Sequence, residues 1–427
     1  MQPIVGRAGP TCVPMLPGRC DLQSLSARLS LLSVLLASCG GARATTLSRA
    51  VTDTLPGGIV RVMSAGPTAW TDSTGARLVE EGRFQGQDGT PAELGEPGSV
   101  AVDDAGRIYV SDRKPASIKV FAPDGKLVRV IGREGEGPGE FRVGFIAVRG
   151  AHLVLHDPQL ARTSVWDTSG AFLRSWHTSC CYWTDIQVDR QDRVYVPSMA
   201  APKPGVRPRG VPYVRWTLDG ANVDTVWVPQ REGQKSWTVS TTRNGKVVGA
   251  MSTEVPFTPG IVWALHPDAG IVYGWTGGYS MVRSSTGSDT ARVFGRSWTP
   301  EPVTDRQRKD AVEEKIKESG QTYGLDALRA AFHLSDVPNS LPAYRILRVD
   351  ESGRVWARRY AVTDTMRTYW DVFDSVGTYL GPVKAPLNVP WWGRQAWTRD
   401  GFVTVIEDAE GRPTVVRFRL VLGPRAR

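Results

Sequence analysis

The pattern that recurs most clearly along the chain is an alternation of apolar and polar residues in short runs. Residues 100–112 (VAVDDAGRIYVSD) hold two such runs on either side of a polar turn with Gly106, which is typical of a β-hairpin. A second pair of runs occupies residues 118–121 and 127–131, separated by a turn at residues 123–125. The two hairpins together predict four antiparallel strands, as in one blade of a β-propeller.

The first hairpin has six copies in the sequence. They begin near residues 100, 146, 186, 262, 347 and 395. Internal repeats of this kind are typical of propellers and other arrays of similar units. The sequence therefore predicts an all-β fold, a six-bladed β-propeller of four-stranded antiparallel blades over residues 59–422, with a tail at 423–427.

A ring of blades has to be closed, because a free sheet edge pairs readily with other chains. Residues 70–79 (WTDSTGARLV) resemble the second hairpin of a blade, although they precede the first copy. We expect them to complete the outer part of the last blade, whose inner strands come from the C-terminal end. Residues 415–418 compete for the third position in that blade. The sequence therefore leaves open whether one or two N-terminal strands are donated.

One segment, residues 298–340, has a helical pattern and falls between the fourth and fifth blades. Thr304 and Asp305 can cap a helix from Arg306 to Ser319 that Gly320 ends, and a second short helix is expected over residues 325–332. Such an insertion can act as a lid or a partner surface over the channel mouth, or it can be a solvated decoration.

The first blade carries a family resemblance. Residues 97–141, which include the segments GRIYV (106–110), DG (124–125) and IGREGEGPGEF (131–141), resemble an NHL-type repeat. Over residues 59–422 the chain is similar to the bacterial six-bladed β-propellers found among exported and lipid-anchored proteins. The fourth and sixth blades depart furthest from the motif. The resemblance implies the fold, and the family shares no single reaction that could be transferred to this chain.

The composition agrees with a folded protein. Hydrophobic residues make up 41% and charged residues 22% of the 427 positions, proportions that exclude a wholly disordered chain. No apolar run reaches the roughly 18 residues that a membrane-spanning helix needs. The net charge is +9, but the arginines are scattered among carboxylates, whereas nucleic-acid binders concentrate basic residues on one face. We therefore expect no nucleic-acid partner.

The N-terminal segment has the features of an export signal. Arg28 precedes a short apolar run over residues 29–37, and Cys39 follows small residues in the sequence LASCG. This order resembles the lipobox of bacterial lipoproteins, which implies a signal peptide at residues 1–38, lipidation of Cys39, a linker at 39–58 and a cell-envelope location. The alternative is a plain signal peptide with an incidental cysteine. The lipid anchor is the only membrane contact that we expect.

Two cysteines remain in the predicted mature domain, Cys180 and Cys181, which are adjacent. An oxidising compartment allows them to form a disulfide with each other in a strained small ring. Two free thiols packed in a buried loop are the alternative.

The candidate binding residues follow from propeller geometry. The turns between first and second and between third and fourth strands lie on one side, here called the turn face. Long connections gather on the opposite side, the long-loop face, and the longest cover residues 180–183, 197–212 and 297–344. Aromatic and guanidinium groups suit a small molecule, a glycan or a protein partner. The predicted ligand-binding residues are Arg113, Trp183, Arg359, Trp391 and Trp392. Rim packing without a ligand is the alternative.

Signals for catalysis are weak. The five histidines include one pair at helical metal-ligand spacing, His152 and His156, but that pair falls on a predicted strand and loop. No catalytic residues, metal or cofactor are predicted. The sequence favours a monomeric binding or interaction module over an enzyme. The alternative is a lactonase- or lyase-type propeller, in which Asp112, His156 and Asp157 could approach a metal near the channel.

Overall fold

The computed structural model describes residues 49–66, 68–70, 75–180, 183–198, 210–230, 235–244, 246–320, 323–362, 369–385 and 394–423. Within these residues, six sheets form the blades of a propeller: five are four-stranded and antiparallel, and the sixth has four antiparallel blade strands extended by two more. The predicted fold class is therefore confirmed.

Each blade runs from an inner strand to an outer strand. Blade 1 contains β4 (Pro97–Val102), β5 (Ile108–Arg113), β6 (Ala116–Phe121) and β7 (Leu127–Ile131), and blade 2 contains β10 (Phe145–Arg149), β11 (His152–Asp157), β12 (Arg162–Asp167) and β13 (Phe172–His177). Blade 3 contains β14 (Gln187–Val188), β15 (Val194–Pro197), β16 (Gly210–Trp216) and β17 (Asn222–Pro229), and blade 4 contains β20 (Ile261–Leu265), β21 (Ile271–Trp275), β22 (Ser280–Ser284) and β23 (Arg292–Arg296). Blade 5 contains β24 (Tyr344–Val349), β25 (Val355–Arg359), β26 (Tyr369–Phe373) and β27 (Tyr379–Lys384). Blade 6 contains β28 (Gln395–Thr398), β29 (Gly401–Glu407), β30 (Pro413–Leu422) and β3 (Ala76–Phe84). Two short strands, β8 (Arg133–Glu134) and β9 (Glu140–Phe141), pair in the connection from blade 1 to blade 2.

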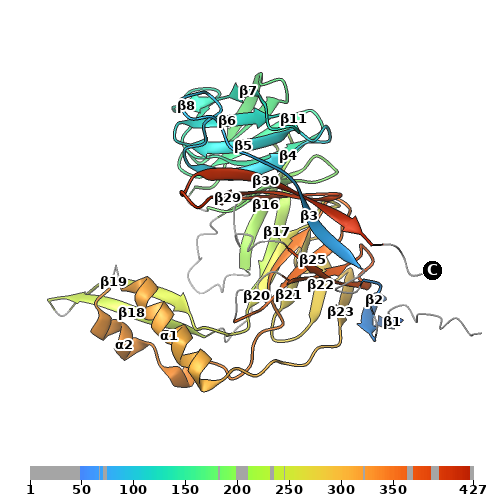
Figure 1. Ribbon diagram of the computed structural model, residues 1–427, viewed down its shortest axis with the longest axis vertical. Helices are drawn as coiled ribbons and strands as arrows, with labels where there is room; N and C mark the ends of the chain where they lie inside the picture. Colours follow the sequence, from blue (N-terminus) through green and yellow to red (C-terminus); the bar gives the residue numbers. More distant parts are fainter. Residues whose placement is uncertain are drawn as a thin grey trace, which may run out of the picture. The chain divides into compact units, whose positions relative to one another are not determined.

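Blade 6 is built from both ends of the chain. Strand β3 pairs antiparallel with β30, in a register that runs from Ala76 opposite Leu422 to Phe84 opposite Val415. Figure 1 shows this pairing as blue β3 beside red β30. The predicted closure is confirmed, and the open question has an answer: one N-terminal strand enters blade 6, while the C-terminal end supplies its third strand.

A second N-terminal element extends blade 4. Strands β1 (Arg49–Leu55) and β2 (Ile59–Ala65) form a hairpin, and β2 pairs in parallel with β23. The Ser64 hydroxyl also accepts the backbone N–H of Tyr379 in blade 5 at 2.9 Å. Residues 49–55 are thus a strand, whereas the sequence assigned residues 39–58 to a linker. The repeat pattern did not reveal this hairpin, because β1 and β2 extend the outer edge of blade 4 and occupy none of the four strand positions that the repeat defines.

A recurring aspartate organises three of the turns on the turn face. Asp103, Asp189 and Asp350 each accept the backbone N–H groups two and four residues ahead and the side chain of the arginine four residues ahead. The same carboxylates accept Tyr109 Oη at 3.1 Å, Tyr195 Oη at 3.0 Å and Trp356 Nε1 at 2.8 Å, respectively. One carboxylate therefore accepts hydrogen bonds from the backbone N–H groups of a tight turn and from a buried aromatic side chain on the second strand of its blade.

The insertion between blades 4 and 5 does not pack alone. Helices α1 (Asp305–Ser319) and α2 (Leu325–Ala331) and the 3₁₀ turn η1 (Leu334–Asp336) share a hydrophobic cluster with the hairpin β18 (Ser236–Arg243) and β19 (Lys246–Glu254). Trp237 stacks on Phe332 with ring centroids 4.5 Å apart. Its Nε1 donates to Asp336 at 3.0 Å. Two insertions, one on either side of blade 4 in the sequence, thus lie side by side (Figure 1) and share one small core.

The helix boundaries follow the sequence signals. Thr304 caps α1 through a reciprocal capping box with Gln307, and Gly320 ends the helix. The second helix ends at Ala331, one residue before the expected boundary. In the described part of the chain, neither helix is long and apolar enough to cross a membrane.

The turn aspartates can be tested with two adjacent substitutions. Asp103→Ala leaves a buried tyrosine hydroxyl, an arginine and backbone donors of one turn without their acceptor. We expect it to lower the free energy of unfolding by about 3 kcal/mol in chemical denaturation. Asp104→Ala changes the charge equally at the exposed neighbouring position and should change stability little. Equal effects of the two substitutions would contradict this role for Asp103.

Candidate functional site

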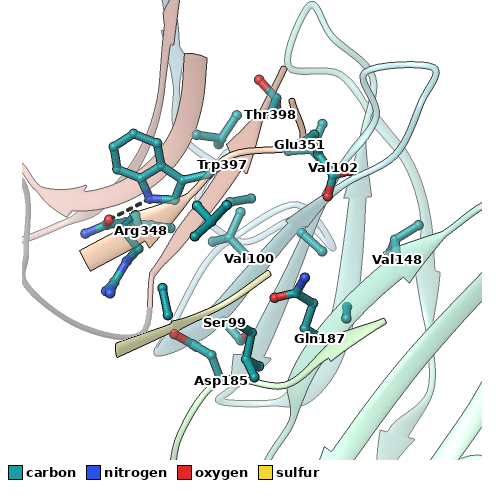
Figure 2. A pocket seen from close by; sticks show the side chains of 18 of the residues that line it. Ser99, Val100, Val102, Val148, Asp185, Gln187, Arg348, Glu351, Trp397 and Thr398 are labelled. Atoms are coloured by element: carbon teal, nitrogen blue, oxygen red, sulfur yellow. Dashed lines mark hydrogen bonds between the residues drawn. The ribbon is translucent and has the colours of Figure 1, made fainter. Parts of the chain in front are cut away.

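The inner strands of the blades surround a central cavity of about 1050 Å³. Strands β4, β10, β14, β20, β24 and β28 all contribute lining residues. Figure 2 shows that apolar side chains such as Val100, Val148 and Trp397 share this lining with Ser99 and Gln187. Polar and apolar groups share the wall about equally, and a concave cavity of this size with convergent polar groups is typical of small-molecule sites.

The channel wall carries a carboxylate and a guanidinium from different blades. Asp185 lies two residues before β14, the inner strand of blade 3, and Arg348 lies in β24 of blade 5 (Figure 2). Burial raises the pKa of Asp185, and the positive charge of Arg348 opposes that rise. Burial likewise lowers the pKa of Arg348, against the attraction of Asp185. The described part of the chain supplies no hydrogen-bond donor to the Asp185 carboxylate, which leaves its oxygens available to a ligand.

A stacked pair of predicted residues lies close to Asp185. The Arg113 guanidinium lies 5.3 Å from the centre of the Trp183 ring, at the long-loop end of β5. Trp183 lines the channel, is 43% exposed and meets Phe145 edge-to-face at 6.3 Å. The pair offers an aromatic surface held in place by a cation–π contact.

Ion pairs bridge the opposite end of the channel, at the turn face. Arg149 of blade 2 donates to Glu351 of blade 5 at 2.9 Å, although these two blades are opposite in the ring. Arg190 of blade 3 donates to the backbone carbonyl of Glu351 and pairs with Asp268 of blade 4. In Figure 2, Glu351 and Thr398 lie toward this end, whereas Asp185 and Ser99 lie toward the other. Four blades are therefore linked across the turn end.

A second, smaller cavity of about 380 Å³ lies beside blade 5 and the base of the helical insertion. The predicted residue Arg359 lines it, together with Arg296 from the end of β23. Both guanidinium groups donate to Asp371, at 2.8 Å from Arg359 and 2.9 Å from Arg296. The hydroxyl groups of Tyr279 and Tyr379 donate to the same carboxylate. These donors hold the pKa of the fully buried Asp371 below its ordinary value despite its burial.

The structure divides the predicted site. Arg113 and Trp183 are in contact at the central channel, whereas Arg359 lines the second cavity. Trp391 and Trp392 lie outside the described residues, as does Cys39. Cys180 is disulfide-bonded, but every other cysteine lies outside the described residues, so the pairing with Cys181 stays a prediction.

Sequence reasoning missed Asp185 and Arg348. A signal was present for Arg348, because this arginine interrupts the apolar run of an inner strand between Leu347 and Val349. Asp185 gave no such signal, since a polar residue just before a strand is common in turns.

The residues considered for a metal site have structural roles. The buried Asp112 accepts the backbone N–H groups of Gly95 and Glu96 and pairs with Lys119. Asp157 occupies the matching position in blade 2, where it accepts backbone N–H groups from the connection before β10. His156 is buried between Thr163 and Thr178. The described residues contain no group of three or more His, Cys, Asp or Glu placed to hold a metal ion.

The comparison with protein families agrees with the architecture. Residues 90–143, which contain blade 1, match the profile of a family described as "6-bladed beta-propeller". The resemblance to six-bladed propellers is confirmed. Among curated proteins, none matches the chain.

Several solved structures are similar at low identity. A protein from Bacteroides fragilis described as exported is 13% identical, with 82% of this chain and 98% of that chain covered and a TM-score of 0.46. The aldose sugar dehydrogenase of Streptomyces coelicolor is 12% identical, with 81% and 98% covered and a TM-score of 0.41. Virginiamycin B lyase from Staphylococcus aureus is 10% identical, with 81% and 100% covered and a TM-score of 0.38. At such scores these likenesses carry no argument about function.

The buried histidine predicts a pH dependence of stability. Burial lowers the pKa of His156 to about 4, whereas a histidine in the unfolded chain titrates near 6.5. Below about pH 6.5 the unfolded chain binds a proton that the folded protein does not, so the free energy of unfolding falls as the pH drops toward 4. His156→Gln should remove up to about 3 kcal/mol of this fall, measured by denaturation at several pH values.

Exposed His333 provides the matched control. His333→Gln should leave the slope of stability against pH unchanged. If His156→Gln keeps the wild-type slope as well, His156 is not neutral and buried in the folded protein.

Proposed function

We propose that this propeller is a binding module that takes a small, neutral, hydroxyl-rich molecule of the saccharide class into its central channel. The observation that carries the proposal is the pair Asp185 and Arg348, which places opposite charges in the wall of one cavity. A carboxylate accepts hydrogen bonds only, and a guanidinium donates only. Hydroxyl groups do both, so a polyhydroxylated ligand can donate to the carboxylate and accept from the guanidinium at the same time.

The balance of charge supports a neutral ligand. Asp185 and Arg348 influence each other electrostatically, and an ion would be attracted by one and repelled by the other. The Gln187 amide adds a donor and an acceptor to the same wall. Trp183 and Trp397 line the cavity too, and flat aromatic surfaces suit the apolar faces of sugar rings.

The long-loop face is the proposed entrance. At the turn face, the pairing of Arg149 with Glu351 and the contacts of Arg190 extend across the channel. Arg113 and Trp183 lie at the other end, where no bridge between opposite blades is found in the described part of the chain. A ligand that enters there meets Trp183 first and then Asp185.

Calorimetric titration with a panel of neutral mono- and disaccharides tests this function. Asp185→Asn keeps the side-chain shape but removes the charged acceptor. We expect it to weaken saccharide binding by about tenfold or more, because hydrogen bonds to charged groups are worth about 1.5–3 kcal/mol. Asp219→Asn, at an exposed turn of the same blade, should bind as the wild type does. Saccharide affinity that is equal in Asp185→Asn and wild type, or no binding by any saccharide of the panel, would refute the proposal.

We also propose that the module works at the cell envelope, anchored through Cys39. The sequence LASCG after an apolar run over residues 29–37 supports export and lipidation. Cys39→Ala should move the protein from the membrane fraction to the soluble fraction when cells are fractionated, and the wild-type N-terminal peptide should carry lipid in mass spectrometry. Unchanged fractionation without a lipid-modified peptide would show that the protein is not anchored there.

A further inference from the structure

We infer that the cavity beside blade 5, lined by Arg296 and Arg359, is a second binding site that takes a small organic monoanion: a carboxylate attached to a planar ring. This site lies apart from the channel and shares none of its lining residues.

The guanidinium groups of this cavity are held in fixed orientations. Arg359 donates to Asp371 through both Nε and one terminal nitrogen, and Arg296 donates through another terminal nitrogen. The Arg296 guanidinium also lies 4.3 Å from the ring centre of Tyr279 and 5.0 Å from that of Tyr379. Groups that are ordered before binding lose little conformational entropy when a ligand arrives, which favours affinity.

The charges of this cluster do not cancel. Two guanidinium groups face one carboxylate, Asp371, which is fully buried behind the cavity wall. Glu301 also lines the cavity but is exposed, so solvent screens its charge. Nε of Arg296 is buried without a hydrogen-bond partner in the described part of the chain. Within the described residues, one guanidinium charge is therefore balanced only by the exposed Glu301, and one buried donor has no partner. An anionic ligand would supply both the negative charge and the acceptor.

The remaining wall indicates the body of the ligand. Trp298, Tyr360 and Tyr369 line the cavity together with Leu341, Pro342 and Ala343. Tyr369 is itself fixed by Arg359, whose guanidinium carbon lies 5.6 Å from the centre of the ring. Aromatic walls stack well on a planar ring, and a volume of about 380 Å³ admits one such ring with its carboxylate.

A ligand there would contact both chain segments that lead to and from the helical insertion. Residues 298–301 leave blade 4 and residues 341–343 enter blade 5, and the two segments pair through the backbone of Leu341 and Glu301 at 2.8 Å. Binding should therefore also stabilise the base of the insertion.

Benzoate is the probe, and benzyl alcohol is its neutral counterpart of similar shape. We expect benzoate to bind at one site per chain in calorimetry and to raise the melting temperature, and benzyl alcohol to bind at least tenfold more weakly. Arg296→Met should weaken benzoate binding about tenfold or more. Arg292→Met, on the same strand but outside the cavity and partly exposed, removes an equal charge and should leave the benzoate affinity unchanged.

A second variant covers the case in which Arg296→Met fails to fold. Tyr369→Ala removes an aromatic side chain of the cavity wall but none of the hydrogen-bond donors to Asp371. It should weaken benzoate binding about fivefold. Equal affinities for benzoate and benzyl alcohol, or wild-type benzoate affinity in Tyr369→Ala and in folded Arg296→Met, would overturn the proposal. Because Asp185 and Arg348 are unchanged in all these variants, the outcome is independent of the channel proposal.

Discussion

The pairing of β3 with β30 is the constraint on which the rest of the structure depends. The last blade needs a strand from the other end of the chain: residues 76–84 complete a sheet whose other strands come from residues 395–422. Bringing such distant segments together costs loop-closure entropy, which grows only slowly with chain length. The cost is offset by the backbone pairs of β3 and by the burial of Ala76 and Leu78 in a core that also contains Trp356 and Trp370 of blade 5. Closure thus joins the last blade to its neighbour and pairs the otherwise open edge of β30.

Within the closed ring, blades 1 and 5 carry an ion pair at the same repeat position, but the positive and negative residues are exchanged between the two strands. Asp112 on β5 pairs with Lys119 on β6 in blade 1, and Arg359 on β25 pairs with Asp371 on β26 in blade 5. The strand registers make these positions equivalent. Lys119 is opposite Val110, two residues before Asp112, and Asp371 is opposite Ala357, two residues before Arg359. In blade 1 the carboxylate of Asp112 accepts backbone N–H groups and the Lys119 ammonium group, and both side chains are buried. In blade 5 the exchange places an arginine at the cavity, and Arg296 joins from blade 4.

The sequence predicts the architecture well because the architecture is encoded locally. Each blade follows from alternating residues and short turns, and α1 follows from Thr304 and Gln307 at its start. The hairpin β18–β19 escaped prediction because Trp237 and Val239 are buried only by helices that arrive about seventy residues later in the sequence. Arg113 and Arg359 are the last residues of β5 and β25, the second strands of their blades. However, the sequence pattern gives no position around the ring, so their separation into two cavities was not predictable. The same holds for Asp185 and Arg348, which approach each other only because blades 3 and 5 share a channel.

We propose that the channel between Asp185 and Arg348 is a ligand site entered from the long-loop face. The most direct measurement is a crystal structure of the protein soaked with the tightest-binding neutral disaccharide. We expect difference density for a sugar inside the channel, with ring hydroxyls within hydrogen-bond distance of the Asp185 carboxylate and the Arg348 guanidinium. Density for the bound sugar on the outer surface of the blades, with the channel filled only by water, would contradict it.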